Sequence, residues 1–422
     1  MRLPGIVGAL HLALASLLLA SGVHGAERKL VASGGAGLDE LGYSVAISGG
    51  TIVAGSIMDF VGPNAAQGSA TVFTRNGSGW NEEATLVAPD GAANDTFGFS
   101  VAIDGNTIAV GAFKDSIGST LLQGSVYIFV RNGSEWTQQA KLLAGDGEAD
   151  DVFGYSVALD GDTLVVGAPG CDNGVFAAYG AAYVFVRNGT TWTQQARLQH
   201  VGGWTSDNFG LNVAIDGNTI VVSSPWTDVA TVQNQGAAWV FVRNGSTWSQ
   251  QARLTASDAA IFDEFGRSVA ISGETILVGS QARIGATEYQ GAAYIFERSG
   301  VSWTETAKLI APDGAYNDRF GFSVALEGDT AVVGCSGDDL GDHQNQGSIY
   351  VFTRREGTWP LHAKRTTHDG DTFDDLGYSV AISGDEIATG VPFDDVGSSL
   401  DQGSVQVFSA SAVPQKRRSA RK

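Results

Sequence analysis

The stretch Phe153-Gly154-Tyr155-Ser156-Val157-Ala158-Leu159 decides the fold, because the chain repeats this phrase seven times with small changes. Successive copies lie 55 or 56 residues apart, and the other six begin at Leu41, Phe97, Phe209, Phe265, Phe320 and Leu376. Six tryptophans keep the same step: Trp80, Trp136, Trp192, Trp248, Trp303 and Trp359. So constant a period indicates one array of repeats, although a chain of 422 residues ordinarily suggests several domains.

Each repeat is predicted to contain four short strands. In the third repeat these are expected at residues 155–159, 163–167, 181–187 and 192–198. Asp160-Gly161 and Asn188-Gly189 mark tight hairpin turns, since such residues tolerate positive φ. Four-stranded antiparallel units repeated around an axis predict an all-β fold, a seven-bladed β-propeller of residues 27–409.

The two ends of the repeat array predict how the ring closes. Residues 28–31 match the sequence of the outer strand around Ala140, while the seventh repeat ends at Phe408 with no outer strand after it. We therefore expect the N-terminal strand to complete the last blade, which removes exposed sheet edges. The repeated tryptophans, which open the outer strands, are expected to pack between neighbouring blades.

The termini outside the array have different compositions. Arg2, an apolar stretch at 6–20 and small residues before position 26 predict a signal peptide at residues 1–25. The mature protein is therefore expected to be secreted, extracellular and without a transmembrane segment. Residues 410–422 form a basic tail, interpreted as a disordered end or as an attachment to an acidic surface.

Charge and composition narrow the function. The 45 acidic and 25 basic residues give a net charge of −20, which excludes ordinary electrostatic binding of nucleic acid. Most of the 57 glycines are explained by turns. The two cysteines, Cys171 and Cys335, fall in different repeats and are expected to be unpaired.

The connections between strands divide into two kinds. First-to-second and third-to-fourth turns should emerge on one face of the ring, the tight-turn face. Second-to-third loops and blade-to-blade crossings should form the other, the long-loop face. They contain 29 acidic and three basic residues, so this face is expected to be strongly acidic.

Phe153-Gly154, followed by Gly167-Ala168-Pro169, resembles the FG-GAP repeat found in the propeller of integrin α-subunits. The resemblance covers residues 27–408 and implies an extracellular adhesion or ligand-binding domain. Integrin-type repeats carry a calcium loop between the first and second strands. Here that connection is only Asp104-Gly105-Asn106 or its equivalent, which cannot supply the roughly six to eight oxygens that calcium takes. The family's calcium sites are therefore not carried over.

Two sets of aspartates on the long-loop face recur with the repeat. One set, interpreted as capping a turn through backbone N–H groups, is Asp39, Asp95, Asp151, Asp207, Asp263, Asp318 and Asp374. The second set is Asp90, Asp146, Asp258, Asp313 and Asp369. The densest stretch contains Asp369, Asp371, Asp374 and Asp375, which are weak candidates for a Ca²⁺ site.

The candidate ligand-binding residues are those that break the repeat. Trp204 and Trp226 belong to the fourth repeat and have no equivalents elsewhere, and Asp228 lies beside Trp226. Arg283 stands where four other repeats hold aspartate. Exposed aromatic residues suit sugar rings or apolar side chains, whereas the alternative is two loop aromatics that pack on each other.

Two classes of function remain open. The first is a binding or adhesion module that recognises an extracellular protein or glycan through the acidic long-loop face. The second is a polysaccharide hydrolase or lyase, or a lectin, with Trp204 and Trp226 as a sugar platform. No catalytic residue is predicted, because no histidine belongs to a recognised catalytic motif.

Overall fold

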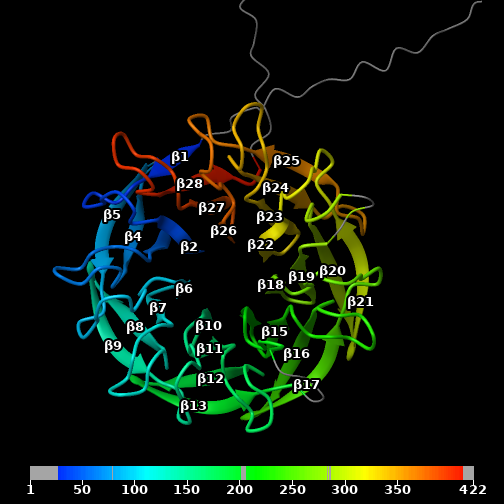
Figure 1. Ribbon diagram of the computed structural model, residues 1–422, viewed down its shortest axis with the longest axis horizontal. Coiled ribbons are helices and arrows are strands. Elements are labelled where there is room, and N and C mark those ends of the chain that lie inside the picture. The colour runs from blue at the N-terminus through cyan, green and yellow to red at the C-terminus, as the bar shows by residue number, and fades with distance from the viewer. Residues whose placement is uncertain (1–26, 78, 201–205, 283, 285–286, 412–422) are drawn as a thin grey trace, which may run out of the picture.

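The computed structural model describes residues 27–77, 79–200, 206–282, 284 and 287–411. Within these residues, seven four-stranded antiparallel sheets form a closed ring, and every regular element is a strand (Figure 1). The predicted all-β, seven-bladed β-propeller is therefore confirmed. The predicted signal peptide at 1–25 and the tail from residue 412 onward lie outside the described residues.

In each blade the strands follow one another from the propeller axis outward. The first blade contains β2 (Leu41–Ser48), β3 (Thr51–Ser56), β4 (Ser69–Asn76) and β5 (Gly79–Leu86). The second contains β6 (Ser100–Asp104), β7 (Thr107–Ala112), β8 (Ser125–Asn132) and β9 (Glu135–Leu142). The third contains β10 (Ser156–Asp160), β11 (Thr163–Ala168), β12 (Ala181–Asn188) and β13 (Thr191–Leu198). The fourth contains β14 (Val213–Asp216), β15 (Thr219–Ser224), β16 (Ala237–Asn244) and β17 (Thr247–Leu254).

The remaining blades keep this order. The fifth contains β18 (Ser268–Ser272), β19 (Thr275–Ser280), β20 (Ala292–Ser299) and β21 (Ser302–Leu309). The sixth contains β22 (Phe320–Glu327), β23 (Thr330–Cys335), β24 (Ser348–Thr353) and β25 (Leu361–Arg365). The seventh contains β26 (Ser379–Ser383), β27 (Glu386–Val391), β28 (Ser404–Ser409) and, as its outer strand, β1 (Arg28–Leu30).

Ring closure by the N-terminal strand is confirmed by the register of the last blade. β1 pairs antiparallel with β28, with Arg28 opposite Val407 and Leu30 opposite Val405. Leu30 is buried with residues of both the first and the seventh blade. After β28, which ends at Ser409, Ala410 is still buried against the last blade.

The repeated phrase is explained by close contacts between neighbouring blades. Phe153 is fully buried, and its ring packs edge-on against Tyr183 and Phe185 of the same blade. Gly154 has φ of 93°, a conformation that favours glycine. Gly167, on β11, lies so close to the next blade that a Cβ there would be 2.0 Å from the carbonyl oxygen of Gly210. Glycine is thus favoured by the backbone conformation at position 154 and by the close approach of the next blade at position 167.

The repeated tryptophans pack between blades, as expected. Trp192 is buried in a cluster that draws on the second and third blades. Its indole N–H donates to Gln139 of the preceding outer strand at 2.9 Å, and the Arg187 guanidinium lies 5.1 Å from the ring centroid. Cys171 and Cys335 are buried and unpaired, also as expected.

Candidate functional site

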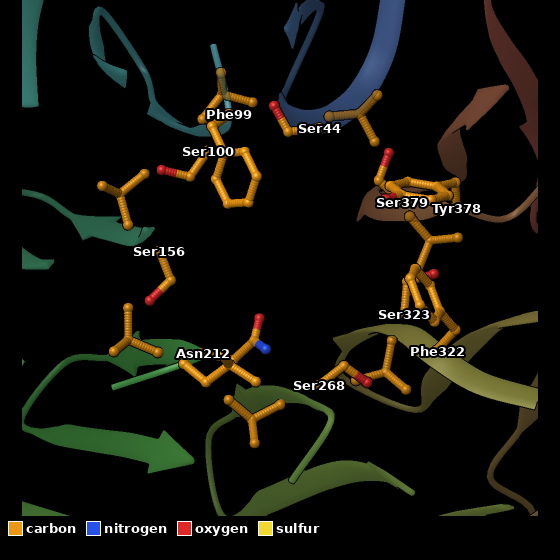
Figure 2. A pocket seen from close by; sticks show the side chains of 18 of the residues that line it. Ser44, Phe99, Ser100, Ser156, Asn212, Ser268, Phe322, Ser323, Tyr378 and Ser379 are labelled. Carbon is orange, nitrogen blue, oxygen red and sulfur yellow. The ribbon is translucent and has the colours of Figure 1, made fainter. Parts of the chain in front are cut away.

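A pocket of about 270 Å³ lies on the propeller axis (Figure 2). Three consecutive residues of each blade line it, at the start of the innermost strands. Since the crossings enter the innermost strands at this end, the pocket opens on the long-loop face. The layer nearest that face, the mouth layer, consists of Tyr43, Phe99, Tyr155, Leu211, Arg267, Phe322 and Tyr378. The middle layer is Ser44, Ser100, Ser156, Asn212, Ser268, Ser323 and Ser379, and seven valines follow.

The middle layer fixes the size of this central pocket. The Ser156 hydroxyl donates to the carbonyl oxygen of Gly210 in the next blade at 3.0 Å, and the other five serines make the equivalent bond. In the fourth blade the Asn212 amide donates to the Arg267 carbonyl oxygen at 2.7 Å. Every blade is therefore bonded to the next around the pocket, which gives a rigid, preformed site.

Aromatic rings dominate the mouth layer. The Phe99 ring lies 5.2 Å from that of Tyr43 and 4.8 Å from that of Tyr155, and Tyr43 lies 4.9 Å from Tyr378. Phe113, from the loop after β7, extends this cluster beside Phe99. Burial raises the pKa of Tyr43, Tyr155 and Tyr378, so their hydroxyls stay protonated, and those of Tyr43 and Tyr378 interact with each other.

Arg267 is the one charged residue among the described residues that line the central pocket. Its guanidinium lies 5.0 Å from the ring centroid of Phe322, a cation–π distance. The side chain is half-buried. The charge of Arg267 also favours the ionised form of nearby Glu264, whose pKa is nevertheless raised by burial.

Trp226, one of the predicted ligand-binding residues, connects to this arginine through Glu264. Trp226 lies half-buried in the loop between β15 and β16, and its side chain, like the charge of Arg267, lowers the pKa of Glu264 against the effect of burial. Sequence reasoning missed Arg267 and Glu264. The available signal was the third position of the repeated phrase, where the other six repeats have tyrosine, phenylalanine or leucine.

Of the other predicted ligand-binding residues, the structure describes Asp228. Asp228 is exposed and accepts the backbone N–H of Asn234 at 2.8 Å. The same bond, six residues along the loop, recurs at Asp172, Asp339 and Asp395, which identifies a loop-shaping role. Trp204 and Arg283 lie outside the described residues.

The aspartates before each FG position cap a turn, as interpreted. Asp151 accepts the backbone N–H of Glu148, three residues earlier, at 2.7 Å. Equivalent bonds of 2.5–2.7 Å are made by Asp39, Asp95, Asp263, Asp318 and Asp374. Asp207 is buried, 3.6 Å from His200 Nε2.

The second set of aspartates is held by cations of the outer strands. Asp90 is 2.7 Å from Lys141 Nζ and accepts the Tyr127 hydroxyl at 2.8 Å. Burial alone would raise the pKa of Asp90, but these two bonds outweigh it and lower the pKa. Ion pairs with Arg197, Lys308, Lys364 and Lys29 hold Asp146, Asp258, Asp313 and Asp369. The charges of these five aspartates are thereby balanced by cations.

The four weak calcium candidates have separate surroundings. Asp369 pairs with Lys29, Asp371 lies 2.9 Å from His343 Nδ1, and Asp374 caps its turn. Burial raises the pKa of Asp375 to about 7. Among the described residues, one group of three potential ligand atoms lies within 4.8 Å, from Glu27, His368 and Asp369. Only one of the four candidates belongs to it, and Lys29 supplies a competing positive charge.

The fourth blade also departs from the others in its buried interior. His200 is stacked between Tyr179, at 4.6 Å, and Trp239, at 4.3 Å between ring centroids. The neighbouring repeats have Ala144 and Ala256 at the position of His200, and a tyrosine where Trp239 stands. The stack replaces the tyrosine, aspartate and lysine cluster of other blades with an aromatic one.

Comparison with known proteins places these features in a family. The described part of the chain contains no helix long and apolar enough to cross a membrane. No curated protein matches the sequence. The family model for the FG-GAP repeat matches seven times, at residues 25–73, 80–129, 136–185, 192–241, 248–296, 303–352 and 359–408. Each segment runs from an outer strand to the third strand of the next blade, as the closure by β1 requires. The chain therefore belongs to the FG-GAP repeat family.

Proposed function

We propose that this protein is a secreted binding or adhesion module that holds an extracellular protein or glycan on its long-loop face, around the central pocket. The FG-GAP propeller fits a binding or adhesion module in general. The assignment to this face is supported by the distribution of exposed apolar side chains, and the assignment to a ligand outside the cell by the signal peptide predicted at residues 1–25.

Exposed large apolar residues gather on the long-loop face. Phe60 is 66% exposed, Phe262 47% and Tyr289 41%, all in loops or crossings of that face. Further members are Leu38, Met58, Leu121, Leu122, Val175, Ile261, Tyr316, Phe373 and Leu400. On the tight-turn face the exposed examples in the described chain are Val301 and Leu361. Apolar groups concentrated on one face favour a contact surface there, since scattered ones carry no such meaning.

The carrying observation is that this apolar set surrounds a preformed central pocket on the same face. Binding sites in rigid scaffolds are characteristically concave, with loops supplying the variable contacts. The lysine pairs that neutralise the second set of aspartates make a close approach of a partner less costly, because fewer bare charges must be desolvated.

The test of the proposal is an array of extracellular matrix proteins and glycans probed with the purified protein. The variant Phe262→Ser with Tyr289→Ser removes two exposed apolar groups from the long-loop face. The matched control is Val301→Ser, which removes one from the tight-turn face. We expect specific signals that the double variant weakens by about tenfold and the control leaves unchanged. Equal binding by all three proteins would place the contact elsewhere.

Secretion is tested separately. The full chain with a C-terminal tag is expected in the culture medium, with an N-terminus at Ala26 by mass spectrometry. Retention of the intact chain inside the cell contradicts the extracellular part of the proposal.

A further inference from the structure

We propose that the central pocket binds one acidic monosaccharide at the end of a glycan, with Arg267 pairing to the sugar carboxylate. This inference rests on the proposed function, which brings a ligand to the long-loop face, and names the ligand class for the pocket itself.

The first step of the argument is charge. Arg267 makes no ion pair with a described residue, and its charge acts on the Glu264 carboxyl only through a longer-range electrostatic interaction. Phe322 covers one side of the guanidinium, which leaves its N–H groups to face the pocket or solvent. A half-buried guanidinium in this state favours an anion, and its planar fork matches a carboxylate in two-pronged geometry.

The second step is size and surface. A volume of about 270 Å³ is at or below the range for drug-sized ligands, so it suits a single sugar ring better than a chain of several residues. The rings of Phe99 and Phe322 project into the opening in Figure 2 and offer apolar surface for the C–H side of a sugar. A simple acidic side chain would leave this surface unused.

The third step is hydrogen bonding. Below the mouth layer, the serine hydroxyls use their protons on neighbouring carbonyl oxygens but keep lone pairs free to accept. Tyr155 adds a protonated hydroxyl at the mouth. A ring of acceptors with a few donors above it complements the many hydroxyls of a monosaccharide. Cation, aromatic faces and hydroxyl acceptors together fit an acidic sugar.

Glu264 gives the proposal an internal control. Its carboxylate interacts with Arg267 and opposes the approach of a second carboxylate to the same cation. Replacing it with glutamine keeps the size of the side chain and removes the negative charge. Glu264→Gln should therefore strengthen binding of an acidic sugar and leave a neutral sugar unaffected.

The experiment is calorimetric titration of the purified full chain with glucuronate, with glucose as the neutral control. We expect glucuronate to bind and glucose to bind at least about tenfold more weakly. Arg267→Phe, which restores the residue type of Phe99, should lose about tenfold or more, while Arg267→Lys retains part of the affinity. Glu264→Gln should gain several-fold. Arg75→Gln, at an exposed arginine of the tight-turn face, should change nothing.

Several results would overturn the inference. These are no glucuronate binding, equal binding of glucose, full affinity in Arg267→Phe, or an unchanged affinity in Glu264→Gln. Binding of a glutamate-rich peptide without glucuronate binding would assign the pocket to an acidic protein instead. Thermal unfolding of each variant checks that it is folded, and Glu264→Gln keeps the test valid if Arg267→Phe fails to fold. Array ligands bound without glucuronate binding would leave the proposed function standing and remove only this inference.

Discussion

Lys29 Nζ lies 2.7 Å from Asp394 Oδ2, although the two residues are 365 positions apart. Asp394 belongs to the loop after β27, in the blade that β1 completes. The same contact occurs inside continuous blades, between Lys141 and Asp115 and between Lys364 and Asp338. The first strand therefore replaces an outer strand, and its lysine makes the same side-chain contact as the lysines of complete outer strands. The ring is closed by backbone pairing and by this ion pair.

Removal of the closing cation should destabilise the ring. Lys29→Ala leaves Asp394, which is 4% exposed, without its ion partner. A buried carboxylate deprived of its cation costs about 3 kcal/mol, less where water reaches the site. Denaturant unfolding at pH 7 should show this loss, with Lys114→Ala, at an exposed lysine of a loop, as the control. Equal stability of the two variants would mean that the pair contributes nothing to closure.

The close approach of blades predicts a sharp difference between two glycines. At Gly167 an added Cβ meets the Gly210 carbonyl oxygen at 2.0 Å, so Gly167→Ala must push two blades apart. Gly189 has φ of 63° with nothing near its Cβ, so Gly189→Ala adds only backbone strain, roughly 1 kcal/mol. We expect Gly167→Ala to lower the melting temperature several times more than Gly189→Ala does. Similar losses would show that the blades can separate at low cost.

Asp375 predicts a loss of stability with rising pH. Burial raises its pKa to about 7, above the value of about 3.9 for an unfolded chain. The folded state therefore holds a proton between about pH 4 and 7 that the unfolded state has lost, so stability is present below this window and declines as pH rises through it. Asp374, with a pKa also raised to about 7 by burial, adds to the same decline.

The variant Asp375→Asn tests this assignment. Asparagine tolerates the φ of 58° at this position and cannot ionise. The free energy of unfolding of the variant should fall less steeply between about pH 4 and 7, by about 1 kcal/mol over the window, and Asp374 should maintain the remainder. Parallel pH profiles for the variant and the wild type would exclude Asp375 as a source of the decline.

The fold could be predicted almost completely from the sequence, because each blade carries the same local signals. In the third repeat, the predicted strand at 163–167 is observed at Thr163–Ala168, and that at 192–198 at Thr191–Leu198. The cause is physical: Asn188-Gly189 sets the hairpin, Phe153 is fully buried, and Gly167 allows the close approach of the next blade. Ring closure was also predictable, since the sequence of β1 resembles the sequences of the outer strands.

The candidate site was predictable only in part. Trp226 was found because it breaks the pattern of the loops, but its partner Glu264 lies in the next crossing and becomes a neighbour only through the ring. Arg267 is a single change in a variable position of the repeated phrase. Its significance depends on seven such positions meeting around one axis, which the sequence period alone does not show.

The measurement that tests the account most directly is hydroxyl-radical footprinting of the wild-type protein with and without the strongest ligand from the array. The account predicts that the ligand protects Phe60, Phe262 and Tyr289, which are exposed on the long-loop face, and leaves the oxidation of Val301 unchanged. Protection of Val301 on the tight-turn face, with no change at Phe60, Phe262 and Tyr289, would contradict it.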